Sequence, residues 1–428
     1  MSLMNDLRKY MFNNKIDMVY IDDSAIISML YSDLSNVRDI IIMQNSIFIR
    51  KIKVFGFLGE NSKSNTYLTI NDVINTFEIT VIGLIFERLK IEDFGSFLRN
   101  GNYYFFDISP FFNTLLFFKN EEDLFRLHCS ARLTEKIIQR TLKNSSGRRY
   151  NQNCIINLFL EECGKVGAKD THINVIRLNS FDCLTPIFSI DCGISYFGFF
   201  SDITRMFCYD MLSREIKERF QFLVELQNAT VNIIRENLNI KDLFITLNRR
   251  YNSNFMFKRV QSGFGHGIGK RIHEGYSLRS DQKWTFQNGY SFTLEPILSF
   301  DDMELRIENM YEVKNGKARR INTLLSDDII TLSNYSNQLE SKKFDNELYY
   351  TNPEVMIFEG NDCNFLANLS CDSLSKGKVS YLKISKSALT IIKEFQHPSL
   401  LTKIKSKYPK DRDYIDFLIA EEILLNKK

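Results

Sequence analysis

Hydrophobic runs of strand length alternate with helix-like stretches over the first quarter of the chain. The runs "IDMVYI", "RDIIIM", "SIFIRKIKVFGF" and "NYYFFDI" are rich in β-branched and aromatic residues, which favour strands. This alternation predicts a small α/β domain over residues 1–117. No cluster of residues with catalytic chemistry stands out within it.

Helical patterns follow. Asn120 is a favourable N-cap, and the acidic residues 121–123 would lie at the positive end of a helix dipole. A second helix is predicted over residues 152–163, stopping at Gly164, and a third over about 213–237. The apolar residues of the first helix recur with helical spacing on one face: Leu124, Leu127, Ala131, Ile138 and Leu142.

Strand-like runs come between and after these helices. They read "PIFSIDCG", "YFGFFSDITRMF", "YSFTLEPIL" and "LRIENMYEVKNGKARRI", and "KNGK" is typical of a hairpin turn. Residues 118–330 are therefore predicted to form an antiparallel sheet with helices on one face. A polar stretch at about 332–347 is predicted to be a linker.

The C-terminal residues 350–428 predict a third, small domain. "NPEVMIFEGNDCNFLANL" is typical of short strands with a turn at Gly360–Asn361, and "KVSYLKIS" of another strand. Three short helices are expected next: one capped by Ser385, one capped by Ser399, and one over "DYIDFLIAEEILL". Strands followed by three short helices are typical of a winged-helix-like domain.

Composition narrows the functional classes. A chain of 428 residues is longer than a domain with a single hydrophobic core usually is, so more than one domain is expected. Its net charge of +3 does not favour binding to nucleic acid or to an anionic membrane. The eight cysteines include no CxxC pair, so we expect reduced, mostly buried thiols. The sequence shows neither a long apolar span nor the apolar run of a signal peptide at its start. We therefore expect a cytoplasmic protein with no nucleic-acid or membrane partner.

The glycine-rich stretch "GFGHGIGKRIHE" is not a phosphate loop. A Walker loop requires glycine where Phe264 stands and serine or threonine where Arg271 stands. A GxGxxG pattern fails as well, at Ile268 in one register and at Lys270 in the other. What remains chemically distinctive is the pair of histidines within the stretch, His266 and His273.

Four acidic residues accompany these histidines. Asp191 and Asp202 would face each other on neighbouring antiparallel strands if residues 192–196 form the turn between them. Glu295 and Glu308 stand in otherwise apolar strand-like runs, where an unpaired carboxylate is unfavourable. Four carboxylates and an imidazole suit two divalent cations bridged by a water.

Each of these residues also has a simpler explanation. The aspartates could belong to a turn and a solvent-facing position, and His266 could be a core histidine. Glu295, before a proline, could end an edge strand, and Glu308 could pair with Arg306. Their combination within one domain favours the metal interpretation.

The order and spacing of these blocks resemble those of the pita-bread metallopeptidases, which include methionine aminopeptidase, aminopeptidase P, prolidase and creatinase. "IDCGISYFGFFSDITRMF" resembles the family's D-x-G…D-I-T-R-T-F block, and "GHGIG" with "HE" resembles its histidine block. "FTLEP" and "RIEN" resemble the remaining two, so the resemblance covers about residues 115–320. It implies an α+β fold: a pita-bread catalytic domain after a creatinase-like N-terminal α/β domain.

The resemblance also implies roles for individual residues. The metal ligands would be Asp191, Asp202, His266, Glu295 and Glu308, and their presence separates the chain from histone-chaperone relatives that have lost them. Two divalent ions are implied, with Mn, Co, Fe and Zn all acceptable. His273 would stabilise the tetrahedral intermediate, Glu295 would also be the general base, and Arg306 would hold a ligand carboxylate.

The chain departs from the prolidase pattern at two histidines. Ser262 stands four residues before His266, where that branch has a histidine. Before the first aspartate, His172 is slightly too early for the branch's other histidine, and Arg177 is nearer the expected place. Ser262 and Arg177 are therefore candidate substrate contacts, and specificity for Xaa-Pro dipeptides is in doubt.

The function implied is that of a dinuclear-metal hydrolase of the Xaa-Pro aminopeptidase-like class, acting on a peptide through a metal-bridging hydroxide. One alternative is a non-peptidase enzyme on the same fold, with creatinase-like C–N chemistry or a biosynthetic role. Another is a catalytically weak peptide-binding protein. The tail resembles PqqD-like modules that recognise peptides during peptide maturation; a packing or homodimerisation domain is the alternative.

Overall fold

The computed structural model contains two compact units, Met1–Leu116 and Phe117–Lys428. The described residues are 3–30, 37–51, 55–57, 70–86, 89–98, 101, 103–145, 151–168, 170–178, 187–210, 212–257, 263–300, 303–332, 348–351, 354–360, 363–369, 381–396, 399–411, 414–415, 418–419 and 423–426. Ser262 and most of the predicted linker lie outside them.

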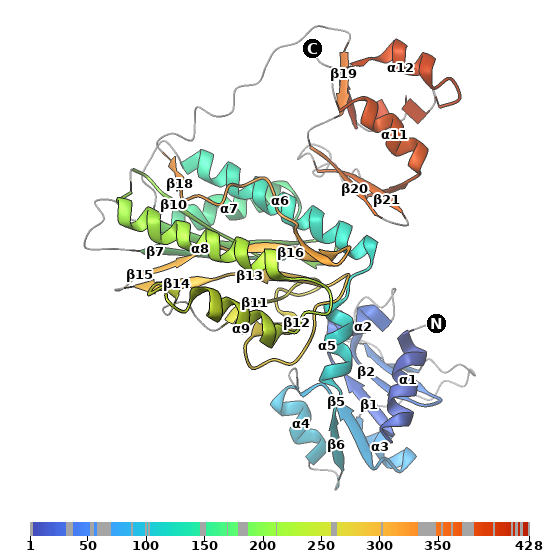
Figure 1. The fold of residues 1–428 in the computed structure, drawn as a ribbon. Helices are drawn as coiled ribbons and strands as arrows, with labels where there is room; N and C mark the ends of the chain where they lie inside the picture. The colour runs from blue at the N-terminus through green and yellow to red at the C-terminus, as the bar shows by residue number, and fades with distance from the viewer. Residues whose placement is uncertain are drawn as a thin grey trace. The chain divides into compact units, whose positions relative to one another are not determined.

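The first unit is built on a six-stranded sheet in the order β4-β3-β2-β1-β5-β6 (Figure 1). The predicted strand runs are strands, and β1 is antiparallel to β2 but parallel to β5. Its elements are α1 (Leu3–Asn13), β1 (Met18–Ile21), α2 (Ser24–Leu30), β2 (Val37–Met43), β3 (Ile47–Lys51), β4 (Phe55–Phe57), α3 (Ile70–Phe77), β5 (Val81–Leu84), α4 (Ile91–Leu98), β6 (Tyr104–Asp107) and α5 (Ser109–Phe117), which ends at the division.

Strand β1 shows why the sequence of this unit contains continuous hydrophobic runs. Met18 and Tyr20 belong to one buried cluster, and Val19 and Ile21 to the other. A strand that is buried on both faces has no polar positions to alternate with. The mixed α/β prediction for this region is therefore confirmed by its packing.

The second unit contains two five-stranded sheets and a two-stranded ribbon. One sheet has the order β18-β10-β8-β7 with β9 on β8, the other β12-β11-β13-β16-β17, and β14 pairs with β15. Their bounds are β7 (Asp170–Leu178), β8 (Ile187–Tyr196), β9 (Phe199–Phe200), β10 (Ile203–Cys208), β11 (Gly263–Gly267), β12 (Glu274–Arg279), β13 (Ser291–Leu294), β14 (Ile297–Phe300), β15 (Met303–Arg306), β16 (Asn309–Lys314), β17 (Lys317–Arg320) and β18 (Ile330–Thr331).

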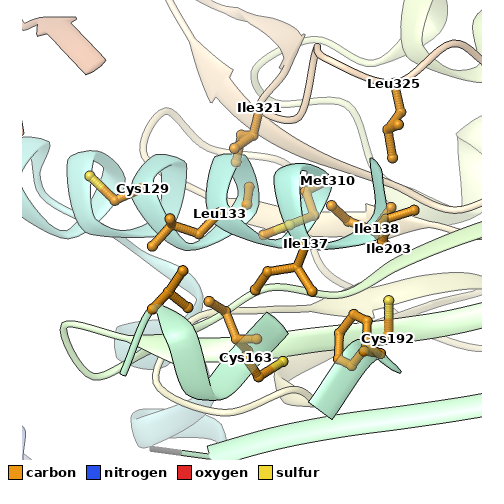
Figure 2. Close-up of a cluster of buried hydrophobic side chains, with 14 of the residues drawn as sticks. Cys129, Leu133, Ile137, Ile138, Cys163, Cys192, Ile203, Met310, Ile321 and Leu325 are labelled. Carbon is orange, nitrogen blue, oxygen red and sulfur yellow. The ribbon is translucent and has the colours of Figure 1, made fainter. Parts of the chain in front are cut away.

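Four helices cover these sheets, in two pairs. Helices α6 (Glu121–Ser145) and α7 (Gln152–Lys165) pack on the sheet of β8, where α6 buries one face in a large apolar cluster (Figure 2). Helices α8 (Arg214–Ile233) and α9 (Ile240–Tyr251) pack with strands of the second sheet, and α8 also packs against β8, β10 and the β14–β15 ribbon (Figure 1). The prediction of one antiparallel sheet with helices on one face is thus wrong in number, since the described residues form two five-stranded sheets, and in the first of them β18 is parallel to β10.

Helix boundaries follow local chemistry. The Asn120 side chain accepts a hydrogen bond from the Asp123 N–H at 2.9 Å, so the predicted N-cap of α6 is confirmed. The prediction that α7 stops at Gly164 is wrong, because the helix continues to Lys165. Gly167, with φ of 66°, takes the left-handed conformation that follows the helix end.

The C-terminal residues form two three-stranded sheets and two described helices. Strand β19 lies between β23 and β24, and β21 lies between β20 and β22. The predicted third helix is wrong at its end, because the apolar residues there form β24, which pairs with β19. The bounds are β19 (Leu348–Thr351), β20 (Val355–Glu359), β21 (Asn364–Asn368), β22 (Leu382–Ile384), α11 (Lys386–Glu394), β23 (Ser399–Leu400), α12 (Leu401–Lys407) and β24 (Leu424–Asn426).

Of the two helix N-caps predicted in this region, the structure shows the one at Ser385 and places Ser399 in a strand. The Ser385 hydroxyl accepts from the Ala388 N–H at 3.1 Å, which confirms the first cap. Ser399 lies in β23, and its hydroxyl donates to the Glu394 carbonyl at 2.9 Å, at the end of the preceding helix. None of the helices in the described part of the chain combines the length and apolar character needed to cross a bilayer.

The sheet of β20, β21 and β22 packs on α6. The Phe125 and Phe365 rings stack with centroids 5.1 Å apart and planes 16° apart. The Glu121 carboxylate accepts from the Cys363 N–H at 3.1 Å, and Lys136 forms an ion pair with Glu354. The first part of the tail is therefore integrated with the α6 layer, and its status as a separate domain over 350–428 stays a prediction.

Candidate metal centre

Two neighbouring antiparallel strands carry the aspartates. Asp191 lies in β8, and Asp202 comes directly before Ile203, the first residue of β10, which pairs with Cys192. The chain reverses at Phe197 and Gly198, with φ of 52° and 77°, so the turn is not at residues 192–196 as predicted. Because β8 continues to Tyr196, Asp191 lies close to Asp202. Together with His172, these aspartates form a group whose ligand atoms all lie within 4.8 Å of one another.

His266 in β11 directs Nε2 toward three carboxylates. Its distances are 3.6 Å to Asp202 Oδ2, 3.7 Å to Glu295 Oε1 and 3.9 Å to Glu308 Oε1. These separations are too long for hydrogen bonds, and they suit ligand atoms gathered around a common centre. His266 lies in β11, Asp202 directly precedes β10, and Glu295 and Glu308 follow β13 and β15, so four strands bring their ends together here.

The other imidazole nitrogen fixes which atom can bind a metal. His266 Nδ1 lies 3.0 Å from the Gly267 carbonyl, which can only accept, so Nδ1 carries the proton. Nε2 then presents its lone pair to the carboxylate cluster. A hydrogen-bonded, single tautomer of this kind is what metal-ligating histidines require.

The hydrogen-bond partners of the two Glu308 oxygens indicate whether a cation fits the site. One of its oxygens, Oε2, accepts from the Thr204 hydroxyl at 2.9 Å. The other, Oε1, is buried and has no hydrogen-bond partner within the described residues. A buried carboxylate oxygen left without a donor is costly, and a divalent cation would satisfy it.

Arg306 partly neutralises the far side of the cluster. Its Nη1 lies 2.9 Å from Asp191 Oδ2 and 3.7 Å from Glu295 Oε2. The guanidinium thus contacts two of the expected ligands. Among the described residues Arg306 hydrogen-bonds Asp191 and not Glu308, so the simpler explanation of Glu308 as a partner of Arg306 is not supported.

The protonation chemistry also fits a cation. Burial, with Asp202 beside it, raises the pKa of the Asp191 carboxyl to about 6, and burial raises the pKa of Glu295 and of Glu308. Burial lowers the pKa of His266, which keeps its imidazole neutral. Crowded carboxylates that resist ionisation, together with a neutral imidazole, are a donor set that a bound divalent ion stabilises.

Residues 132–315 match the profile of metallopeptidase family M24. This part of the chain is similar to the M24 metallopeptidases, and it makes up less than half of the chain. An uncharacterised peptidase of Methanocaldococcus jannaschii is 25% identical over 215 residues, covering 46% of this chain and 61% of the relative. The chain thus spans less than two thirds of that relative's length.

Two solved structures show the fold. An X-Pro aminopeptidase from Thermotoga maritima superposes with a TM-score of 0.62 at 20% identity, covering 77% of this chain and 100% of that one. The N-terminal domain of a chickpea FACT complex subunit gives a TM-score of 0.61 at 13% identity, covering 76% and 95%. The predicted pita-bread fold is confirmed, and similarity at these identities concerns the fold alone.

His172 lies at the carboxylate cluster, although the sequence interpretation placed it slightly too early. Its Nε2 lies 2.9 Å from Asp202 Oδ1, and it stands opposite Gly193 in the register of β7 and β8. A Cβ at Gly193 would overlap the His172 ring, so the glycine makes this approach possible. Counting residues along the chain placed His172 too early, because position in a strand pair is set by register.

Arg177 lies on the other face of β7. Side chains alternate along a strand, so His172 and Asn174 share one face, whereas Arg177 shares the other with Val175. Val175 is buried in the cluster under α6 and α7. This parity, readable from the sequence, argues against Arg177 as the substitute for the missing histidine.

His273 follows the glycine-rich loop and lies beside His266, with ring centroids 3.9 Å apart. Burial, helped by His266, lowers its pKa, so this imidazole is neutral as well. The structure thus brings His172, His266 and His273 to one carboxylate cluster.

Proposed function

We propose that the M24 domain binds two divalent cations through Asp191, Asp202, His266, Glu295 and Glu308 and hydrolyses a peptide, as in the Xaa-Pro aminopeptidase-like class. The observation that carries the proposal is the convergence of three carboxylates on His266 Nε2, with Glu308 Oε1 left without a donor in the described part of the chain. Family M24 enzymes use divalent metals, usually two, which agrees with this donor set.

The residues have distinct roles in this proposal. Bound cations would polarise the peptide carbonyl and acidify a water. Glu295 accepts the proton of the attacking water, since it lies at the cluster and is held by Arg306. His273 donates a hydrogen bond to the oxyanion that develops on the carbonyl oxygen. His172 hydrogen-bonds Asp202 and so orients that carboxylate.

The test is metal analysis of the folded protein after reconstitution with Mn, Co, Fe or Zn. We expect about two ions per chain, and loss of binding or activity in Asp191→Ala and Glu295→Ala variants that still fold. Well-folded wild-type protein that holds no metal under all four conditions would refute the proposal. Manganese is one of the acceptable ions, and the carboxylate-rich site does not select among them.

Substrate choice is a separate part of the proposal. With Ser262 in place of a histidine, we expect weak turnover of simple Xaa-Pro dipeptides, and a gain in Ser262→His. Comparing Xaa-Pro dipeptides with longer and methionyl peptides decides this point. Turnover of none of them, by protein that binds metal, would favour creatinase-like C–N chemistry or peptide binding without turnover.

For the tail, the contacts with α6 favour the packing role over peptide recognition. A PqqD-like role in peptide maturation would use an outer strand of the tail, such as β20 or β22, to pair with an extended peptide. Binding of the natural peptide by the isolated M24 domain would count against that role. A cytoplasmic location and a homodimer stay predictions.

A further inference from the structure

A buried pair of opposite charges, Lys119 and Glu274, lies next to the metal centre and does not belong to the expected ligand set. Lys119 Nζ is 2.5 Å from Glu274 Oε1, and the side chains are 4% and 1% exposed. Removing two charges from water carries a large desolvation penalty, so a buried ion pair contributes little net stability. A geometric role for Lys119 and Glu274 is therefore worth testing.

Glu274 closes the loop that carries His273. The loop runs over residues 268–273, between β11 and β12, and Glu274 is the first residue of β12, opposite Gly267. The Glu274 carboxylate turns back into the loop, where Oε2 accepts from the Arg271 N–H at 3.2 Å. The side chain of one end of the loop thus holds the backbone at its centre.

Gly269 shows how closely the loop wraps the pair. A Cβ at this position would overlap both Glu274 Oε1 and Lys119 Cε. On its other side, the Gly269 carbonyl accepts from the Phe200 N–H at 2.6 Å, two residues before Asp202. The loop is therefore fixed between the ion pair and the strand that leads to a proposed ligand.

Lys119 is anchored independently of the loop. Its backbone N–H donates to the Gly289 carbonyl at 2.7 Å, and it directly precedes Asn120, the N-cap of α6. Its ammonium group is consequently a fixed point against which the Glu274 carboxylate is held.

We propose that the Lys119–Glu274 ion pair is a positioning device that holds His273 at the metal centre. Glu274 is the next residue after His273, whose ring lies 3.9 Å from that of His266 between centroids. A shift of about 1 Å in a catalytic group can lower the rate by about 100-fold. The inference rests on the proposed role of His273, but its structural part can be tested without any substrate.

The main test replaces both charges in the full-length protein, with Lys119→Met and Glu274→Gln together. Both charges must go at once, because removal of one leaves the other buried and unpaired. The matched control is Arg214→Met with Glu218→Gln, an exposed pair on α8. Imidazole NMR of zinc-loaded and metal-free protein gives a readout that needs no turnover, with His273 assigned from a His273→Gln variant.

We expect the double variant to keep its metal stoichiometry and to shift or broaden the His273 resonance, while that of His128 stays unchanged. On a peptide that the wild type cleaves, kcat should fall about 10- to 100-fold with KM within about twofold. The control pair should change neither. An unchanged His273 resonance in the double variant would overturn the positioning role. If the resonance shifts but the wild type cleaves none of the peptides, the positioning role stands and the proposed function is refuted.

A second variant covers the case in which the double variant does not fold. Gly269→Ala pushes the pair apart without changing any charge. Gly263→Ala on β11 is its control, because among the described residues a Cβ there meets only Arg279 Cγ, at 3.6 Å. We expect Gly269→Ala alone to displace the His273 resonance. Identical spectra for the two alanine variants would overturn the proposal.

Discussion

At the scale of single residues, the metal centre depends on hydrogen bonds behind the ligands. Thr204 donates to Glu308 Oε2 and so aims Oε1 at the cluster. Thr204→Val should lower the affinity for divalent metal about 10- to 100-fold with little loss of fold. Isothermal titration with Mn²⁺ measures this effect, and Thr246→Val, whose hydroxyl bonds only within α9, is the control. Equal affinities in the two variants would contradict the role of Thr204.

The carboxylate cluster also predicts a pH dependence of stability. Burial raises the pKa of Asp191 to about 6 from its ordinary 3.8, so between these values the folded state holds a proton that the unfolded chain has released. The metal-free protein should therefore lose stability as the pH rises through about 6, and Glu308, whose pKa is also raised, extends the loss upward.

Thermal melting in a chelator at pH 5 and pH 8 tests this expectation. Mn²⁺ should raise the melting temperature more at pH 8, because metal binding removes the repulsion between ionised carboxylates. Glu308→Gln should flatten the metal-free profile. A wild-type profile that rises from pH 5 to pH 8 would contradict the assigned cause.

At the scale of elements, the end of α7 gives a paired prediction. Gly164 lies inside the helix, with no atom near its missing Cβ, whereas Gly167 has a φ of 66°. Gly164→Ala should raise the free energy of unfolding by about 0.5–1 kcal/mol. Gly167→Ala should lower it by about 1–2 kcal/mol, because an alanine is strained in the left-handed region. Denaturant unfolding compares the two, and effects of the same sign would contradict the observed helix end.

The sheet of β20–β22 makes a second prediction at this scale. Phe365 is 2% exposed and stacks on Phe125 of α6. Phe365→Ala should lower the free energy of unfolding by about 3–5 kcal/mol, as for other buried aromatic residues. The exposed Phe255 provides the control substitution, with an expected change under about 0.5 kcal/mol. A small effect at Phe365 would show that the tail does not pack on α6 in solution.

At the scale of the whole molecule, deletion of residues 350–428 separates two roles of the tail. The deletion uncovers the apolar face of α6 that Phe358 and Phe365 cover, so the remaining chain should melt at a lower temperature and tend to aggregate. Metal content and turnover are measured on the soluble fraction. A truncated protein that melts at the temperature of the full chain would contradict the packing role of the tail. If it also cleaved its peptide as well as the full chain does, peptide recognition by the tail would be refuted too.

The sequence by itself determined most of the elements and predicted the donor set. Strand runs, the caps at Asn120 and Ser385, and the blocks around Asp191, His266, Glu295 and Glu308 are local signals, because they arise from periodicity and from chemistry a few residues apart. Those blocks were sufficient to predict the pita-bread fold, which the comparisons support.

Only the tertiary structure decided how distant segments meet. Strand register placed His172 opposite Gly193 and beside Asp202, and no count of residues along the chain provides that register. The end of the chain became β24 and not helix because β19 was available to pair with it. The contact between Lys119 and Glu274 joins residues 155 positions apart, and long-range burial of this kind is set by packing and not by local sequence.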